Sequence, residues 1–106
     1  MVRLAFFRVR EDKIERLRWW MDELAWRKDE VLETFEREGT RYEAVYLLPF
    51  KDGPVLLYAM DVDDDEQARQ AFQASSLPID DEHKQIMKEI VAGRAEVEQL
   101  WACSGK

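Results

Sequence analysis

Apolar residues recur at every second position near the start of the chain, which predicts a β-strand over residues 2–9. The apolar side chains alternate between the two sides of this strand, with Val2, Leu4 and Phe6 on one and Ala5, Phe7 and Val9 on the other. A sheet with one solvated face would alternate apolar and polar residues more cleanly. We therefore expect other elements to cover both faces of the sheet.

The apolar spacing then changes to three, four and seven residues, which predicts one long helix over residues 12–38. Asp12 is expected to cap this helix, with Glu15 completing a capping box. Arg37 in the last turn and Gly39 just beyond it are typical of a helix C-terminus. One apolar stripe follows from the spacing, made of Ile14, Leu17, Met21, Leu24, Val31 and Phe35.

Two further strands are predicted over residues 41–50 and 54–62. The intervening sequence KDG is short enough for a tight turn, so the two strands should form an antiparallel hairpin. Pro49 and Pro54 flank the turn, where the loss of a backbone donor does least damage to the sheet.

The second half of the chain predicts two helices and a last strand. The helices are expected over residues 64–75, with Asp63 at the start, and over residues 81–92, and the strand over residues 95–103. The order β-α-β-β-α-α-β predicts one ferredoxin-like α+β domain over residues 1–106, with the second helix broken in two. Its four-stranded antiparallel sheet should carry its helices on one face.

The other face of such a sheet has no element of its own to cover it, which predicts a homodimer through the open sheet face. A chain of 106 residues with 46% hydrophobic residues can form a core, and a second copy would help it to bury the remaining apolar area. Trp20 falls at the edge of the apolar stripe, whereas Trp19 and Trp26 lie on the other side of the helix. Those two are either half-covered surface residues or part of a subunit contact.

Charge and composition narrow the range of partners. Sixteen basic against 23 acidic residues give a net charge of −7, which disfavours nucleic acid and anionic membranes. No apolar run approaches the roughly 20 residues that span a bilayer, and the N-terminus does not resemble a signal peptide. Cys103 is the single cysteine, so neither an internal disulfide nor a cysteine-based zinc site can form. A reducing, cytoplasmic location is the default expectation.

Three segments, RVREDKIERLRWWMDEL, EREGTRYEAVYL and SSLPIDDEHKQIM, resemble a family of short, uncharacterised proteins in the dimeric α+β barrel, ferredoxin-like superfamily. The resemblance covers nearly the whole chain and implies fold and pairing, but no established activity. Wider members of the superfamily include cofactor-free monooxygenases, muconolactone isomerase-like enzymes, haem-degrading enzymes and stress-response proteins. The stretch PIDDEH resembles the family's local signature, so Asp80 and His83 carry over as positions of interest, and Glu43 carries over on a weaker match.

The single histidine is the first candidate for chemistry. If Asp80 caps the third helix, His83 lies on the apolar side of that helix with Met87 and Ile90 and points toward the sheet. The helix N-terminus favours neutral imidazole and Asp80 favours imidazolium, so the histidine is expected to titrate near neutral pH, as general acid/base work requires. The alternative is a partly buried histidine that is hydrogen-bonded to Asp80 or to a strand.

Four other residues are predicted to contact a ligand. Glu43 could share a cavity with His83, Tyr46 and Tyr58 lie in the middle of the hairpin strands, and Arg27 could turn inward to hold Glu43 or an anionic ligand. The ordinary alternatives are core packing for the tyrosines and ion pairs within its own helix for Arg27.

No metal site and no cofactor are predicted. One histidine without a cysteine cluster leaves only carboxylates to complete a metal shell, and DVDDDE lacks the glycine and the final glutamate of a calcium loop. The four glycines are scattered, so familiar sites for ATP, NAD or flavin are not expected. One histidine would be enough to ligate haem, so the sequence does not exclude haem binding.

Two functions remain open from the sequence. The first is a homodimeric small-molecule-binding protein, or a small cofactor-free enzyme of the monooxygenase or isomerase kind, with Asp80 and His83 as catalytic residues. The second is a non-catalytic interaction or stress-associated dimeric module in which His83 is structural. A cavity lined by His83, Tyr58 and Glu43 would favour the first function, and a filled core at that place would exclude it.

Overall fold

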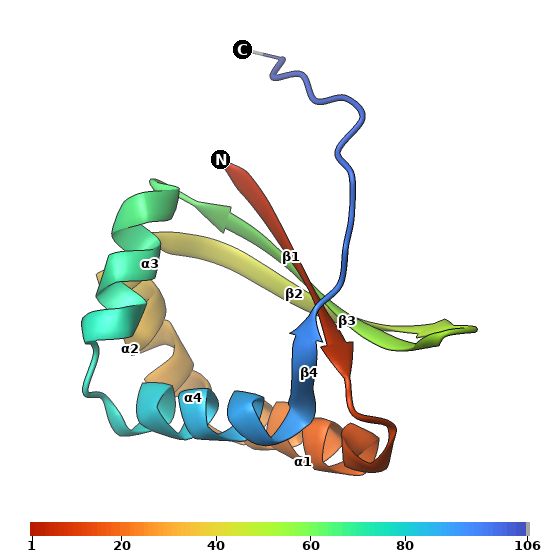
Figure 1. Ribbon diagram of the computed structural model, residues 1–106. Helices are drawn as coiled ribbons and strands as arrows, with labels where there is room; N and C mark the ends of the chain where they lie inside the picture. Colours follow the sequence, from red (N-terminus) through yellow and green to blue (C-terminus); the bar gives the residue numbers. More distant parts are fainter. Residues whose placement is uncertain (106) are drawn as a thin grey trace.

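The computed structural model describes residues 1–105, and the predicted ferredoxin-like α+β fold is confirmed (Figure 1). These residues form a four-stranded antiparallel sheet in the order β2-β3-β1-β4, with helices on one side. The elements are β1 (Val2–Val9), a 3-10 turn (Glu11–Lys13), α1 (Ile14–Trp26), α2 (Lys28–Glu38), β2 (Thr40–Phe50), β3 (Gly53–Val62), α3 (Asp65–Ala74), α4 (Pro78–Ile90) and β4 (Val91–Arg94).

The β2–β3 hairpin forms as the sequence predicts. Pro49 lies opposite Pro54, and Phe50 lies opposite Gly53, which closes the turn. Gly53 has a φ of 123°, a backbone conformation that favours glycine because it has no Cβ. The two strands pair from Thr40 to Phe50, with one shift in register between Thr40 and Tyr42. The other edge of β3 pairs with β1, so β3 lies in the interior of the sheet.

The prediction of one helix over residues 12–38 is wrong, because the helix breaks at Arg27 into α1 and α2. Arg27 has φ −105° and ψ 38°, and its N–H donates to the carbonyl oxygens of Glu23 and Leu24 at the end of α1. The break changes the direction of the chain, so that α1 contacts α4 while α2 contacts α3. Apolar periodicity persists through the bend because both halves face the same sheet, and it therefore does not reveal the break.

The predicted helix caps are partly wrong. Asp12 lies in the 3-10 turn, and α1 begins after Lys13 with no side-chain cap. Asp64, not Asp63, caps α3 by accepting a hydrogen bond from the Gln67 N–H at 2.8 Å, whereas Asp63 forms an ion pair with Arg41. At the end of α2, Gly39 adopts the expected left-handed conformation with a φ of 73°.

Helix α4 begins three residues before the predicted start, because Pro78 occupies its first turn, where proline needs no backbone donor. The helix ends at Ile90, and the chain enters β4 at Val91 without a loop. Val91 and Gly93 pair with β1, so the segment before residue 95 supplies the last strand.

The predicted strand over residues 95–103 is wrong. Residues 95–105 have no regular structure, and Figure 1 shows this segment extending away from the sheet and helices. Leu100 and Trp101 remain 84% and 81% exposed. The alternating apolar pattern of the segment is present, but β1 pairs with β4 only from Phe7 to Val9, and no other strand edge in residues 1–105 receives the segment.

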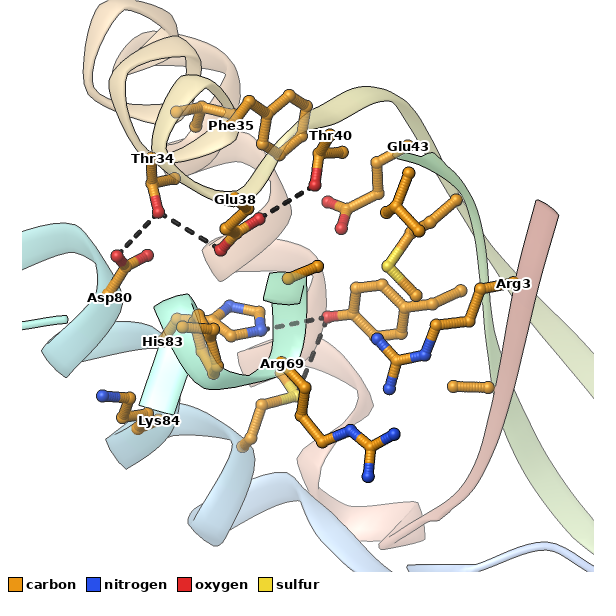
Figure 2. A pocket seen from close by; sticks show the side chains of 18 of the residues that line it. Arg3, Thr34, Phe35, Glu38, Thr40, Glu43, Arg69, Asp80, His83 and Lys84 are labelled. Atoms are coloured by element: carbon orange, nitrogen blue, oxygen red, sulfur yellow. Dashed lines mark hydrogen bonds between the residues drawn. The ribbon is translucent and has the colours of Figure 1, made fainter. Parts of the chain in front are cut away.

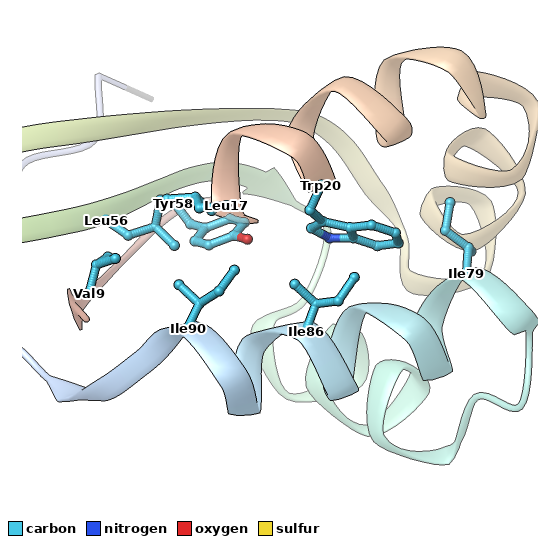
Figure 3. Close-up of a cluster of buried hydrophobic side chains, with 8 residues drawn as sticks. All are labelled: Val9, Leu17, Trp20, Leu56, Tyr58, Ile79, Ile86 and Ile90. Carbon is cyan, nitrogen blue, oxygen red and sulfur yellow. The ribbon is translucent and has the colours of Figure 1, made fainter. Parts of the chain in front are cut away.

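The main core lies between the helices and one face of the sheet (Figure 3). Trp20 is 0% exposed at its centre, as its position at the edge of the apolar stripe predicts. Buried residues of α1, α4 and the strands surround it: Val9, Leu17, Leu56, Tyr58, Ile79, Ile86 and Ile90. Trp19 is half-exposed under the guanidinium of Arg16, and Trp26 is 87% exposed.

The opposite face of the sheet is apolar and bare of helices, as the sequence predicts. The strand register places Leu4, Ala59 and Ala44 in one row across this face, and Phe6, Leu57 and Tyr46 in the next. Leu4 and Tyr46 are 53% and 52% exposed. We call this surface, made of Val2, Leu4, Phe6, Tyr42, Ala44, Tyr46, Leu48, Leu57 and Ala59, the open face.

Candidate functional site

A pocket of about 680 Å³ lies between the helix-covered face of the sheet and helices α2, α3 and α4. His83, Tyr58 and Glu43 all line this pocket, as the first of the two functions requires. Figure 2 shows His83 and Glu43 in its wall. Most of the remaining wall is apolar and aromatic, with Phe7, Phe35 and Phe72 contributed by three different elements. This volume and lining are typical of sites for small organic ligands.

Sheet register brings Glu43 and Tyr58 to the same wall. Glu43 lies opposite Met60, and Tyr58 lies opposite Val45, on the neighbouring strands β2 and β3. Residues paired in this way project to the same side of the sheet, so Glu43 and Tyr58 are diagonal neighbours facing the helices. A shift of one residue in the register would move Glu43 to the open face.

His83 projects from α4 into the pocket, and its main partner is Trp20. The Trp20 Nε1–H donates to His83 Nδ1 at 2.9 Å. Since an indole nitrogen can only donate, Nδ1 must be the unprotonated nitrogen and the ring proton must lie on Nε2. Nε2 faces the Tyr58 hydroxyl at 3.5 Å, so the neutral imidazole donates toward the Tyr58 oxygen.

The expectation that His83 titrates near neutral pH is wrong. Burial lowers the pKa of His83 to about 4, and the opposing effect of Asp80 is smaller. Protonating Nδ1 would also place two N–H donors against each other at the Trp20 contact. His83 is therefore neutral at pH 7, and it is a poor proton acceptor there because Nδ1 already accepts from Trp20 and Nε2 carries the ring proton.

Tyr58 is buried, with Phe7 packed edge-on against its ring. Burial and the nearby Glu43 charge raise the pKa of Tyr58, so its hydroxyl stays protonated. Within residues 1–105, the Met87 sulfur, at 3.8 Å, is the only acceptor for that hydroxyl. Thioether sulfur is a weak acceptor, so the hydroxyl proton is available to a ligand.

Glu43 is the titratable group best suited to proton transfer in the pocket. Burial, followed by the charge of Glu38, raises the pKa of Glu43 to about 7. Among residues 1–105, none donates a hydrogen bond to its carboxyl group. The carboxyl thus faces an apolar pocket without a partner and is close to half-protonated at neutral pH.

Asp80 has a structural contact that the sequence did not predict. It is buried in the first turn of α4 and does not cap the helix, which begins after Leu77. It accepts hydrogen bonds from the hydroxyls of Thr34, at 2.7 Å, and Ser75, at 2.5 Å. Asp80 thereby ties the start of α4 to α2 and holds His83 at the pocket wall.

Glu38 continues this polar chain toward Glu43 (Figure 2). Its carboxyl lies within hydrogen-bonding distance of the Thr34 and Thr40 hydroxyls, at 3.3 and 3.1 Å. Burial is the main cause of a raised pKa for Glu38, with the Asp80 charge contributing. Unlike Glu43, this carboxyl has partners within the protein.

Two predicted site residues lie away from the pocket lining. Tyr46 is on the open face, because strand side chains alternate and Glu43 and Val45 point to the other face. Arg27 does not turn inward to Glu43 but forms ion pairs with Glu30, at 2.8 Å, and with Glu82, at 2.6 Å. The Glu30 pair is the ordinary alternative expected from the sequence, since both residues lie within one helical turn.

Trp20, Thr34 and Glu38 are site residues that the sequence reasoning missed. Trp20 and His83 are 63 positions apart, and Thr34 and Asp80 are 46 apart. No local spacing rule connects residues so distant in the chain. The one available signal was the polar Thr34 next to Phe35 on the apolar side of its helix.

The matching family model covers residues 1–102, and its description is a family of unknown function, DUF6176. The chain belongs to this family. No functionally curated protein matches the chain significantly.

Among solved structures, the chain is similar to the tetracenomycin F2 cyclase from Streptomyces glaucescens, a type-II polyketide cyclase. The TM-score is 0.60 at 16% identity, over 98% of this chain and 99% of that chain. At this identity the similarity establishes the fold alone, which is the ferredoxin-like α+β fold.

Two further features bear on cofactors and membranes. Across residues 1–105, no three side chains of His, Cys, Asp or Glu are grouped so that they could hold a metal ion. None of the helices in this range has the length and apolar character needed to cross a membrane.

Proposed function

We propose that this protein binds an apolar small molecule in the pocket between sheet and helices, and that Glu43 exchanges a proton with that ligand. The observation that carries the proposal is a carboxyl in a mostly apolar pocket to which no group of residues 1–105 donates, and burial there raises the pKa of Glu43 to about 7. Buried charged groups normally have partners, so an unpartnered one in a cavity indicates a functional group.

The chemistry fits a cofactor-free, isomerase-like enzyme better than a passive binding module. A group with a pKa near the working pH is the most effective general acid or base. The similarity in fold to a polyketide cyclase supports the proposal by analogy. Asp80 and His83 then act by holding the pocket in shape, since His83 is neutral and Asp80 is occupied by Thr34 and Ser75.

We also propose that two copies associate through the open face. This surface exposes apolar side chains from β1, an interior strand, and from β2, an edge strand of the same sheet. Exposed apolar surface of this kind marks an interaction site, and a second copy offers the same surface for a twofold contact. The single exposed Cys103 fits a reducing, cytoplasmic location for such a dimer.

Binding of the neutral fluorescent probe N-phenyl-1-naphthylamine tests the pocket. Ala5 lines the pocket, whereas Ala59, on the adjacent strand, belongs to the open face. We expect Ala5→Phe to fill the pocket and weaken probe binding at least about tenfold. The matched Ala59→Phe variant should bind the probe as the wild type does, provided that both variants unfold at similar urea concentrations.

The opposite pattern would contradict the proposal. If Ala59→Phe weakens probe binding and Ala5→Phe does not, the probe binds at the open face and the pocket is not a ligand site. If neither the wild type nor the two variants bind the probe, the proposal fails and the protein is better described as a non-catalytic dimeric module.

A further inference from the structure

Two polar groups on the sheet wall of the pocket, Glu43 and Tyr58, are free to meet a ligand. The Glu43 carboxyl has no donor within residues 1–105, and the Tyr58 hydroxyl has only a thioether to donate to. The other polar side chains that line the pocket near them are occupied. Arg3 pairs with Asp65 at 2.8 Å, and Glu38 is held by Thr34 and Thr40.

These two groups have complementary roles. The Tyr58 hydroxyl is a hydrogen-bond donor, and His83 Nε2–H lies behind it, facing the phenolic oxygen. A donor on the phenolic oxygen draws electron density from it, which strengthens the hydroxyl as a donor to a developing negative charge. The Glu43 carboxylate, diagonal to Tyr58 on the neighbouring strand, can only accept.

We infer that the ligand is an apolar carbonyl compound with a weakly acidic C–H next to the carbonyl, that Glu43 removes this proton and that Tyr58 binds the carbonyl oxygen. This inference rests on the proposed function and assigns a substrate class to the same pocket. A planar enolate of this kind would lie among the Phe7, Phe35 and Phe72 side chains.

The proposed step balances without any added reagent. The Glu43 carboxylate takes the proton, the electrons of the broken C–H bond form a C=C bond, and the carbonyl π electrons move onto oxygen. The resulting enolate oxygen accepts a hydrogen bond from the Tyr58 hydroxyl, which stabilises the charge as it develops. The protonated Glu43 then returns its proton to another carbon of the enolate, which completes an isomerisation, or to the same carbon.

The distance between His83 Nε2 and the Tyr58 oxygen, 3.5 Å, is long for a hydrogen bond. Such contacts commonly tighten only once a ligand is bound. In this arrangement His83 is a positioning residue that acts through Tyr58, and Trp20 fixes its tautomer. The Trp20–His83–Tyr58 contacts thus give the neutral histidine a role in a pocket in which Glu43 is the base.

Proton exchange on 2-tetralone, a bicyclic ketone, tests the inference. In D₂O, the loss of its C1 proton signals in the ¹H NMR spectrum measures removal of the acidic proton. We expect the wild-type protein to accelerate the exchange above that in buffer, and we expect Glu43→Gln to return the rate to the buffer value. The wild-type rate should rise with pH through about 7 and then level off, because only ionised Glu43 accepts a proton.

Tyr58 and Tyr46 form a matched pair, one in the pocket and the other on the open face. Tyr58→Phe should slow the exchange about 100-fold, the usual effect of removing one donor to an oxyanion. Tyr46→Phe should leave the rate unchanged. His83→Phe should lower kcat about tenfold with little change in KM, and should have no further effect in the Tyr58→Phe background, since it acts through that hydroxyl.

Three results would overturn the inference while leaving the binding proposal intact: N-phenyl-1-naphthylamine binds but no exchange occurs, Glu43→Gln still exchanges, or both tyrosine variants behave alike. Additive effects of His83→Phe and Tyr58→Phe would overturn the positioning role of His83. Failure of both the probe and 2-tetralone to bind would reject the proposed function itself.

Discussion

The two faces of the sheet are built from the same strands, yet they differ in the kind of polar group that they contain. The helix-covered face has a large apolar core and, in the pocket beside it, the titratable groups Glu43, Tyr58 and His83. The open face has exposed apolar side chains such as Leu4 and Tyr46. Both faces bury or present apolar surface, but the helix-covered one also encloses ionisable groups whose pKa values are shifted by burial.

The difference between the faces shows that apolar alternation along a strand does not by itself identify the functional residues. Neighbouring residues in β2, Glu43 and Tyr42, fall on opposite faces because strand side chains alternate. The Glu43 carboxyl faces the pocket and its pKa is raised, whereas Tyr42 remains 61% exposed. Function therefore depends on which face a residue occupies, which the register decides.

The largest effect is expected at the centre of the helix-covered face. Trp20→Ala should destabilise the protein by about 3–5 kcal/mol, because it opens a cavity and leaves His83 Nδ1 without its donor. Trp26→Ala, at an exposed position of the same helix, should cost less than about 0.5 kcal/mol. Urea denaturation of both variants measures the difference, and similar costs would show that Trp20 is not the centre of the core.

A substitution at Glu43 should stabilise the protein. In the folded state its pKa is about 7, above the ordinary 4.5, so ionisation favours the unfolded chain as pH rises from 4.5 to 7. Glu43→Gln removes this penalty and should add up to about 3 kcal/mol at pH 8 and nothing at pH 4. Titration of His83 changes the free energy of unfolding equally in the wild type and in Glu43→Gln, so it does not affect the difference between them.

Urea denaturation at pH 8 and pH 4 measures this prediction. A Glu43→Gln variant that is less stable than wild type at pH 8 would mean that the carboxylate has a partner in the folded protein. The same result would remove the reason for assigning Glu43 to the ligand.

A charge on the open face should weaken the proposed dimer. Tyr46→Glu should raise the dimer dissociation constant by about 30-fold, equivalent to about 2 kcal/mol, by burying an unpaired carboxylate. Leu32→Glu adds the same charge to an exposed position of α2 and should leave association unchanged. Sedimentation equilibrium measures both, and a wild-type monomer at all concentrations would exclude the contact.

The smallest effect is expected in the polar chain between the helices. Thr34→Val removes one of the two hydroxyl donors to buried Asp80 and should cost about 1–2 kcal/mol. Ser76→Ala, at an exposed position between α3 and α4, should cost less than about 0.5 kcal/mol. Equal thermal midpoints for the two variants would show that the Thr34 contact does not hold α4 in place.

Residue patterns predicted the fold and part of the site. Local periodicity was sufficient for β1 and the hairpin, because strand alternation and turn residues are read over a few positions. It missed the bend at Arg27, where both helix halves face one sheet, and it placed the last strand at residues 95–103 because that segment also alternates. Strand pairing, which decides the outcome there, is not a local property.

The sequence predicted His83, Tyr58 and Glu43 as site residues, and all three line the pocket. It assigned the titration near neutral pH to the wrong one, because burial and partners decide a pKa and neither is visible in a motif. Trp20, which fixes the His83 tautomer, lies 63 positions away. Only the packing of α1 against α4 brings these two residues together.

The titration of Glu43 in the wild-type protein tests this account most directly. Its side-chain carboxyl ¹³C shift can be followed against pH by NMR and assigned by comparison with Glu43→Gln. The account predicts a midpoint at about pH 7 in the ligand-free protein. A midpoint at the ordinary value of about 4.5 would contradict it, because it would show that the Glu43 carboxylate is solvated or paired in the folded protein.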